Sequence, residues 1–564
     1  MKKNLIFVII AVLLVMAGCK SKQEEEQKTS YTLMFYAVGG GNLDDNLIGN
    51  IYALMGGADD GIKMTFEYKL SKHLQNSQDS ALAQFDGVRR WSSEEPENQE
   101  IIQNIKHNAV IPNFPSCLKT ERIHDAQYFM GSADALSEFI TWSAQKCPAE
   151  HYILIISDHG NGWNITIDGA VCAGDPQPTH KAHKAVLFDD NVDDKCSTTT
   201  DLLSGIQKSQ NHIDMIYMDA CLMSLAENIY PLIGTVDYYM SSLEAVPGVG
   251  GAYDQFLQLL KAQPSNLFAA MGHYCDYCVS DKWWENIGQS FDGPNMSADI
   301  AIYDLNKMQP AFDAIREFAN LMSEYLQSDK EYIQTLEDGS QVHYKYRELV
   351  ENATVRAELA MSSKQNLVPL YFTVSTSILP QLFGEEGFVC SVRDFLVALS
   401  NPEFMDILMS NPEALQMQIN AILQYSNYGV CIADYMKQMS QETARFGETR
   451  FTTIHANYLA AIKSASHISG TLAGKNLSAP YEDASMAVNV YSLSEEGFHY
   501  FGDGIKFLFQ GNRYAKDYTR EQLIRYYRAS EFDQFAKWSE VLIHLNINPS
   551  FLTNSTRYEK YAVN

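Results

Sequence analysis

Two kinds of hydrophobic pattern alternate along the first half of the chain. Nearly unbroken apolar runs occur at Tyr31 to Val38, His151 to Ser157 and Ile213 to Met218. Such runs are typical of parallel strands that are buried on both faces. Between them lie segments with apolar residues at helical spacing, and Ser132 is placed to cap one of these helices. The alternation predicts an α/β fold, in which helices flank both faces of a mostly parallel sheet.

Weaker patterns fill the gaps between these runs. Met64 to Leu70 and Phe85 to Trp91 are further strand candidates, whereas Ser92 to Met130 is polar and irregular. We expect that last stretch to be a long surface excursion. A crossover helix is expected from about Thr199 to Gln207, and another begins at about Asn42.

The second half of the chain, residues 261–564, predicts a largely helical region with a few added strands that packs on the first half. The strand candidates are Leu367 to Val374 and Met486 to Leu493, and the helix candidates are Val392 to Leu399, Pro412 to Leu423 and Phe532 to Leu542.

The first thirty residues differ from the rest. Residues 1–18 have a basic start and a short apolar core, which is typical of a secretory signal. Small residues precede Cys19, as in a bacterial lipobox, so we expect cleavage before Cys19 and attachment of lipid to its thiol; a simple signal peptide is the alternative. Residues 19–30 lack apolar side chains after Cys19 and predict a disordered tether. The folded catalytic domain is therefore expected over residues 31–260.

Composition narrows the function. The net charge of −27 argues against a nucleic-acid partner. The ten cysteines are thinly spread and exclude a disulfide scaffold. Cys275 and Cys278 form a single CxxC pair, which we interpret as helix packing rather than a zinc site.

Candidate chemistry lies where two buried strands end. His159 follows one strand and Cys221 follows another. In parallel sheets, functional residues gather at the carboxyl ends of the strands. A helical pattern follows Cys221, so the positive end of a helix is expected to favour its thiolate. A buried structural cysteine and an ordinary loop histidine are the alternatives.

Several motifs together carry a family resemblance. Tyr152 to Trp163 reads YILIISDHGNGW and Ile216 to Met223 reads IYMDACLM. These runs resemble the histidine and cysteine signatures of clostripain-family cysteine peptidases, which belong to the caspase-like clan. Further similarity covers Tyr31 to Leu43, Leu187 to Asp190, and Glu244 with Pro247 to Gly250.

The resemblance implies a role for each motif residue. His159 would be the general acid and base and Cys221 the nucleophile, with the amides of Gly160 and Cys221 as the oxyanion hole. Asp219 would lie at the bottom of the S1 pocket and bind an Arg or Lys side chain of a protein or peptide substrate.

Other positions are assigned on the same basis. Glu244 and Val249 would also border S1, and Lys181 and Lys184 lie in a turn-rich stretch where self-cleavage is expected. The sequence departs from the family pattern at Val249, where a second acid is common, and at Gly251, where tryptophan is usual.

Two other functions stay open. One is a catalytically impaired relative that acts as a binding lipoprotein, and the other is a glycan-binding outer-membrane lipoprotein built from helical repeats. No cofactor or metal ligand set is predicted. Ca²⁺ at the acidic stretch from Asp189 to Asp194 lacks an EF-hand pattern, so a solvated loop is expected there. We expect a monomer that its lipid anchors in the bacterial cell envelope as an outer-membrane lipoprotein, with an acidic run after Cys19 that resembles a surface-export signal.

Overall fold

The structure is a computed structural model. It describes residues 30–39, 43–59, 61–75, 85–106, 120–160, 162, 186–192, 195–243, 246–287, 298–362, 368–369, 389–390, 410, 430–471, 486–488 and 520–545. No helix among these residues combines the length and the apolar character that crossing a membrane requires.

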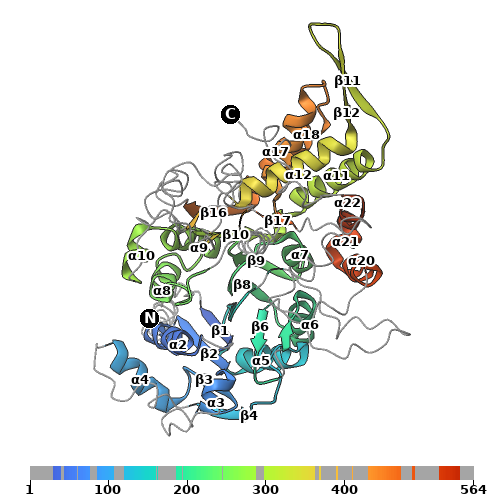
Figure 1. Ribbon diagram of the computed structural model, residues 1–564. Helices are drawn as coiled ribbons and strands as arrows, with labels where there is room; N and C mark the ends of the chain where they lie inside the picture. Colours follow the sequence, from blue (N-terminus) through green and yellow to red (C-terminus); the bar gives the residue numbers. More distant parts are fainter. Residues whose placement is uncertain are drawn as a thin grey trace, which may run out of the picture.

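A nine-stranded sheet forms the centre of the described chain (Figure 1). Its strand order is β16-β10-β9-β8-β5-β1-β2-β3-β4. The middle strands β9, β8, β5, β1 and β2 are parallel, and the strands on both sides of them are antiparallel. The strands are β1 (Tyr31–Val38), β2 (Ile62–Lys69), β3 (Val88–Ser92), β4 (Glu121–His124), β5 (His151–Ser157), β8 (Ile213–Asp219), β9 (Val236–Ser241), β10 (Ala298–Asp304) and β16 (Ser466–Thr471).

Helices cover both faces of this sheet. Up to residue 286 they are α2 (Asp44–Gly57), α3 (Lys72–Gln75), α4 (Pro96–Lys106), α5 (Ala133–Lys146), α6 (Thr199–Ser209), α7 (Ala226–Ile229), α8 (Tyr253–Ala262), α9 (Leu267–Cys278) and α10 (Asp281–Asn286). Short strands β6 (Val186–Asp189) and β7 (Lys195–Ser197) pair with each other beside the sheet.

Alternate side chains of β1 separate the two layers of the core. Leu33 and Phe35 pack with residues of α2, α8 and α9, whereas Met34 and Tyr36 pack with residues of α5 and α6. The chain runs from β1 through α2 to β2 on one side and then returns to β5 on the other side of β1. The connections therefore reverse between β1 and β5, and ligands of open α/β sheets bind at the carboxyl ends of the strands at such a point. The predicted α/β architecture is confirmed.

The C-terminal region joins this sheet rather than lying apart from it. Strands β10 and β16 extend the sheet beyond β9. The remaining helices stack at that end of the molecule, and the hairpin of β11 and β12 projects from them (Figure 1). These helices and the hairpin are α11 (Gln309–Leu326), β11 (Glu331–Thr335), β12 (Gln341–Lys345), α12 (Tyr346–Ser362), α17 (Ile432–Ala444), α18 (Arg450–Ala465), α20 (Arg520–Ala529), α21 (Glu531–Ala536) and α22 (Trp538–His544). The same region has the two-residue strands β13 (Val368–Pro369), β14 (Val389–Cys390), β15 (Val430–Cys431) and β17 (Ala487–Val488) and the 3-10 turn η3 (Leu305–Lys307). A second 3-10 turn, η2 (Tyr230–Leu232), lies earlier, between α7 and β9. A sheet of this kind contradicts the helical-repeat lipoprotein.

Two local predictions were wrong. The stretch after Ser92 contains α4 and the edge strand β4 rather than an irregular excursion, because Ile102 supplies a buried anchor for the helix. The predicted helix from Phe532 to Leu542 is broken at Lys537, which has a φ of 56°. Asp533 accepts hydrogen bonds from the Ser539 amide and hydroxyl at 2.6 and 2.8 Å, and so starts a second helix.

Several predicted elements fall on residues that the structure does not describe. They are the helix start at Asn42, the helices at 392–399 and 412–423, and most of the strands at 367–374 and 486–493, of which residues 368–369 and 486–488 are described.

Candidate active site

A cavity of about 200 Å³ opens at the carboxyl ends of β1, β5 and β8, the place where the strand order reverses. Three elements of the sheet, the first turns of α2 and the loop after β9 surround it. Its lining residues are Val38, Leu43, Asn46, Leu47, Asn50, Ser157, Asp158, His159, Asp219, Cys221, Val246, Pro247, Gly248 and Gly250. His159 and Cys221, predicted from strand ends, therefore share one cavity with Asp219.

Cys221 is a free, half-buried cysteine that directly follows Ala220 at the end of β8. The Val246 amide donates a hydrogen bond to its Sγ at 3.3 Å. Burial raises the pKa of the thiol, and the amides of Val246 and Gly160 act against that effect. Because backbone N–H groups converge on the sulfur, negative charge at this position is partly stabilised by fixed dipoles.

The predicted cause of thiol activation was wrong. Cys221 does not open a helix: Leu222 has a φ of 65°, and α7 begins only at Ala226. The left-handed turn at Leu222 interrupts the apolar spacing that predicted a helix. Amides of the loop after β9 and of the β5 end replace the helix terminus as the electropositive surroundings of Sγ.

Gly160 places the turn that carries His159 directly against Cys221. A β-carbon at position 160 would lie 2.1 Å from the carbonyl oxygen of Cys221 and 2.7 Å from its nitrogen. Contacts this short cannot exist with a side-chain atom, so the two backbones pack at a distance that requires glycine. His159, which directly precedes Gly160, is half-buried.

Asp219 forms the buried acidic wall of the cavity. Its Oδ2 accepts hydrogen bonds from the Tyr253 hydroxyl at 2.6 Å, the Gly251 amide at 3.3 Å and the Ser157 hydroxyl at 3.3 Å. Burial raises the pKa of Asp219, and the hydrogen bond from Tyr253 is the largest opposing effect. The site thus holds a carboxylate that is desolvated but oriented by three donors.

Gly250 and Asn50 border the same carboxylate. Gly250 has a φ of 77°, and a β-carbon there would lie 2.9 Å from Asp219 Oδ2 and 2.4 Å from Asn50 Nδ2. Asn46 and Asn50 are one helical turn apart on α2 and face the cavity together. Neither residue was predicted from the sequence, although two asparagines at i and i+4 next to an apolar helix face were a usable signal.

A cluster of tyrosines occupies the region beside Gly251. A β-carbon at Gly251 would lie 2.7 Å from the hydroxyls of both Tyr217 and Tyr274. These two hydroxyls are 3.2 Å apart, and Tyr253 lies beside them against Asp219. The missing tryptophan side chain therefore leaves no hole, because tyrosine rings fill that part of the core.

The other predicted site residues have different outcomes. Val249 is 37% exposed and lies outside the lining of the cavity, although its neighbours Gly248 and Gly250 belong to it. Glu244, Lys181, Lys184 and Cys19 lie outside the described residues.

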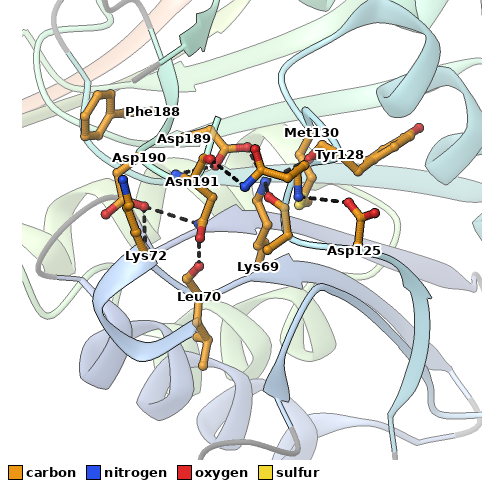
Figure 2. Close-up of polar contacts among 12 residues, drawn as sticks. Lys69, Leu70, Lys72, Asp125, Tyr128, Met130, Phe188, Asp189, Asp190 and Asn191 are labelled. Carbon is orange, nitrogen blue, oxygen red and sulfur yellow. Dashed lines mark hydrogen bonds and ion pairs between the residues drawn. The ribbon is translucent and has the colours of Figure 1, made fainter. Parts of the chain in front are cut away.

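The acidic stretch that begins at Asp189 is not the solvated loop that we expected. Asp189 is fully buried and pairs with the buried Lys69 at the end of β2 (Figure 2). A partner on a distant strand makes this burial tolerable, and sequence spacing does not reveal such a partner. Asp193 and Asp194 lie outside the described residues.

Metal ligands are scarce in the part of the chain that the structure describes. One group, formed by His212, Asp214 and Asp237, has ligand atoms close enough to hold an ion. It lies at the amino ends of β8 and β9, away from the cavity, and Asp214 is already bonded to His151 at 2.6 Å. Cys275 packs in the core through α9, in agreement with the helix packing predicted for the CxxC pair.

Comparison with known proteins adds independent information. The sequence model of the Clostripain family matches residues 44–544. Clostripain from Hathewaya histolytica is 26% identical over an alignment of 261 residues, and the match covers 43% of this chain and 44% of that protein. The matched segment thus spans less than half the length of that curated relative.

Similar solved structures are more distant. A secreted C11 cysteine protease from Bacteroides thetaiotaomicron, in complex with an irreversible peptide inhibitor, is 18% identical with a TM-score of 0.36 and covers 52% of this chain and 70% of its own. An inactive zymogen of a C11 protease from Parabacteroides distasonis is 12% identical with a TM-score of 0.42 and covers 86% of this chain and 98% of its own.

Proposed function

Since the chain belongs to the clostripain family of cysteine peptidases, we propose that it is a cysteine endopeptidase with a His159–Cys221 dyad. The observation that carries the proposal is the convergence of His159, Cys221 and a buried Asp219 on one cavity at the strand-order reversal. Cysteine catalysis needs a thiolate, a proton donor for the leaving amine and backbone N–H groups that face the oxyanion. The residues around this cavity supply each of these groups.

The reaction follows from this arrangement. His159 accepts the proton of the Cys221 thiol, and the thiolate attacks the carbonyl carbon of the scissile bond. The amides of Gly160 and Cys221 stabilise the oxyanion. The imidazolium then protonates the leaving amine as the C–N bond breaks. Water, deprotonated by the same imidazole, hydrolyses the thioester and regenerates the thiol.

Asp219 is the proposed determinant of cleavage after Arg or Lys. Among the described residues its three donors all bind Oδ2, which leaves Oδ1 to accept from a substrate guanidinium or ammonium group. Burial strengthens the attraction between a carboxylate and a cation. Gly250 packs against both Asn50 Nδ2 and the other carboxylate oxygen, Oδ2. Glu244 is proposed to border the pocket from the loop after β9.

Three further features belong to the proposal. Lipid on Cys19 anchors the protein in the bacterial envelope as an outer-membrane lipoprotein with its peptidase domain exposed. Self-cleavage after Lys181 or Lys184 converts the chain to two pieces. The two pieces stay together, because β5 of the N-terminal piece pairs with β8 of the C-terminal piece in one sheet.

A peptide library with every residue at P1 tests the function. Purified full-length chain should cleave after Arg and Lys, Cys221→Ala should cleave nothing, and Asp219→Ala should lose the basic preference. Absence of thiol-dependent turnover in the wild-type chain would contradict the enzyme and favour the binding lipoprotein. An unchanged P1 preference in Asp219→Ala would remove that residue from the pocket.

A further inference from the structure

A short segment after the self-cleavage region crosses the carboxyl edge of the sheet. We name residues 186–192 the strap. Its Leu187 is fully buried and has a φ of 57°. A residue with a β-carbon rarely adopts this conformation, and it persists only where surrounding contacts determine it. Contacts with neighbouring segments therefore hold the strap in this conformation.

The strongest of these contacts is the ion pair between Lys69 and Asp189. Both side chains are completely buried. Lys69 Nζ also donates to the carbonyl oxygens of Ala126 at 3.1 Å and Tyr128 at 2.8 Å. The ammonium group therefore has three oxygen acceptors. Figure 2 shows Lys69 together with Asp189 and Tyr128 at the end of β2. A buried pair with its hydrogen bonds satisfied fixes both partners, whereas losing one partner leaves an uncompensated buried charge.

Weaker bonds attach the rest of the strap to the same strand end. Asn191 Nδ2 donates to the Leu70 carbonyl oxygen at 3.0 Å. The Lys72 amide donates to Asp190 Oδ1 at 2.8 Å (Figure 2). Lys69 and its neighbours thus form one docking place for the strap.

The strap in turn contacts the catalytic turn. The Phe188 amide, which directly follows the left-handed Leu187, donates to Asp158 Oδ2. Asp158 is buried, lines the cavity and directly precedes His159. The backbone amide of Asp158 also reaches the carbonyl oxygen of Asp219 at 3.4 Å. Asp158 is therefore the point where the strap meets the turn that carries the imidazole.

We infer that Lys69 and Asp189 are positioning residues for His159. Their ion pair holds the strap, the Phe188 amide of the strap fixes Asp158, and Asp158 fixes the turn that presents His159 to Cys221. The inference rests on the proposed function, because it assigns the imidazole as the partner of the thiol. It adds a requirement that lies outside the cavity: two buried charges on β2 and on the strap set the geometry of the dyad.

A matched pair in the same sheet separates positioning from stability. Glu67, two residues before Lys69 on β2, forms a buried ion pair with Arg90 on β3. Removing one partner of either ion pair leaves an unpaired charge in the core, so a substitution at either pair should lower the melting temperature. The inference predicts that only the pair at the strap affects the dyad.

The experiment compares Lys69→Met, Lys69→Met/Asp189→Leu and Arg90→Met in purified full-length chain. For each we measure melting temperature, kcat and KM on an Arg or Lys peptide, and the rate of Cys221 alkylation by iodoacetamide against pH, followed by mass spectrometry of the Cys221 peptide. Assays are run below the lowest melting temperature.

Lys69→Met should lower kcat about 100-fold with little change in KM, since a misplacement of about 1 Å has such an effect. Its alkylation curve should shift to higher pH, because a displaced imidazolium no longer stabilises the thiolate. The double variant should regain melting temperature without regaining kcat. Arg90→Met should lose melting temperature and keep both kcat and the alkylation curve.

Three results would overturn the inference: wild-type kcat in Lys69→Met, a kcat that recovers with stability in the double variant, or an equal loss in Arg90→Met. If wild-type chain cleaves no peptide, the proposed function fails by itself. The alkylation curves still decide the inference, since they report the imidazole near Cys221 without any substrate.

Discussion

Gly160→Ala is the substitution that tests the packing of the His159 turn against the Cys221 turn most sharply. The added β-carbon would lie 2.1 Å from the Cys221 carbonyl oxygen, whereas ordinary contacts begin at 3.4 Å. The obstructing atoms belong to the backbone, so the clash is relieved only if the two turns separate by about 1.3 Å, the difference between those distances. A displacement of about 1 Å between reacting groups lowers the rate about 100-fold. We expect kcat/KM to fall by at least this factor.

The destabilisation that accompanies this change should be modest. Overpacking by one methyl group costs about 1–3 kcal/mol, which leaves a chain of this size folded at room temperature. Gly248→Ala is the matched control, because Gly248 lines the same cavity and a β-carbon there would lie 3.6 Å from its nearest neighbour, Asn46 Nδ2.

The assay is peptide hydrolysis at 25 °C, with the melting temperature and the fraction of alkylatable Cys221 measured on the same samples. Gly248→Ala should retain most of the wild-type kcat/KM. Wild-type kcat/KM in a folded Gly160→Ala variant would refute the close contact between the turns.

Other predictions concern the pocket, the thiol and the distant core. Tyr253→Phe removes a 2.6 Å hydrogen bond to the buried Asp219, worth about 1.5–3 kcal/mol, so kcat/KM for Arg and Lys peptides should fall about 10-fold to 100-fold. That bond lowers the pKa of Asp219, so without it the carboxylate protonates at higher pH and the acid limb of the pH–rate profile should shift to higher pH. An acid limb at the wild-type pH would contradict the role of Tyr253 in keeping Asp219 ionised. His159→Ala leaves a Cys221 thiol whose pKa is raised by burial, so its alkylation should require a higher pH than in wild type. Identical alkylation curves for the variant and the wild type would show that His159 does not affect the Cys221 thiol. Trp538→Ala should reduce the free energy of unfolding by about 3–5 kcal/mol in urea titrations, since the side chain is only 1% exposed, and a loss below about 1 kcal/mol would show that the C-terminal helices contribute little to the fold.

The sequence predicted the parts of the fold that local patterns encode. β1, β5 and β8 are buried on both faces, so their apolar runs were visible without knowledge of their partners. Their parallel order then brought His159 and Cys221 to one edge of the sheet, as a general property of such folds.

Features that depend on distant partners were missed. The left-handed turn at Leu222 has no local signature, because its apolar neighbours have helical spacing. The burial of Asp189 depends on Lys69, which lies on another strand, so the acidic stretch alone resembles a surface loop. The tyrosines that fill the region at Gly251 come from β8, α8 and α9 and meet only after folding.

The most direct test of the central claim is to identify the atom that an irreversible peptide inhibitor with arginine at P1 modifies. Mass spectrometry of the labelled full-length chain should find the adduct on Cys221. His159→Ala and Asp219→Ala should each slow labelling strongly, the first through the thiolate and the second through binding of the arginine. Labelling of another cysteine, or labelling of Cys221 at the wild-type rate in both variants, would contradict the account.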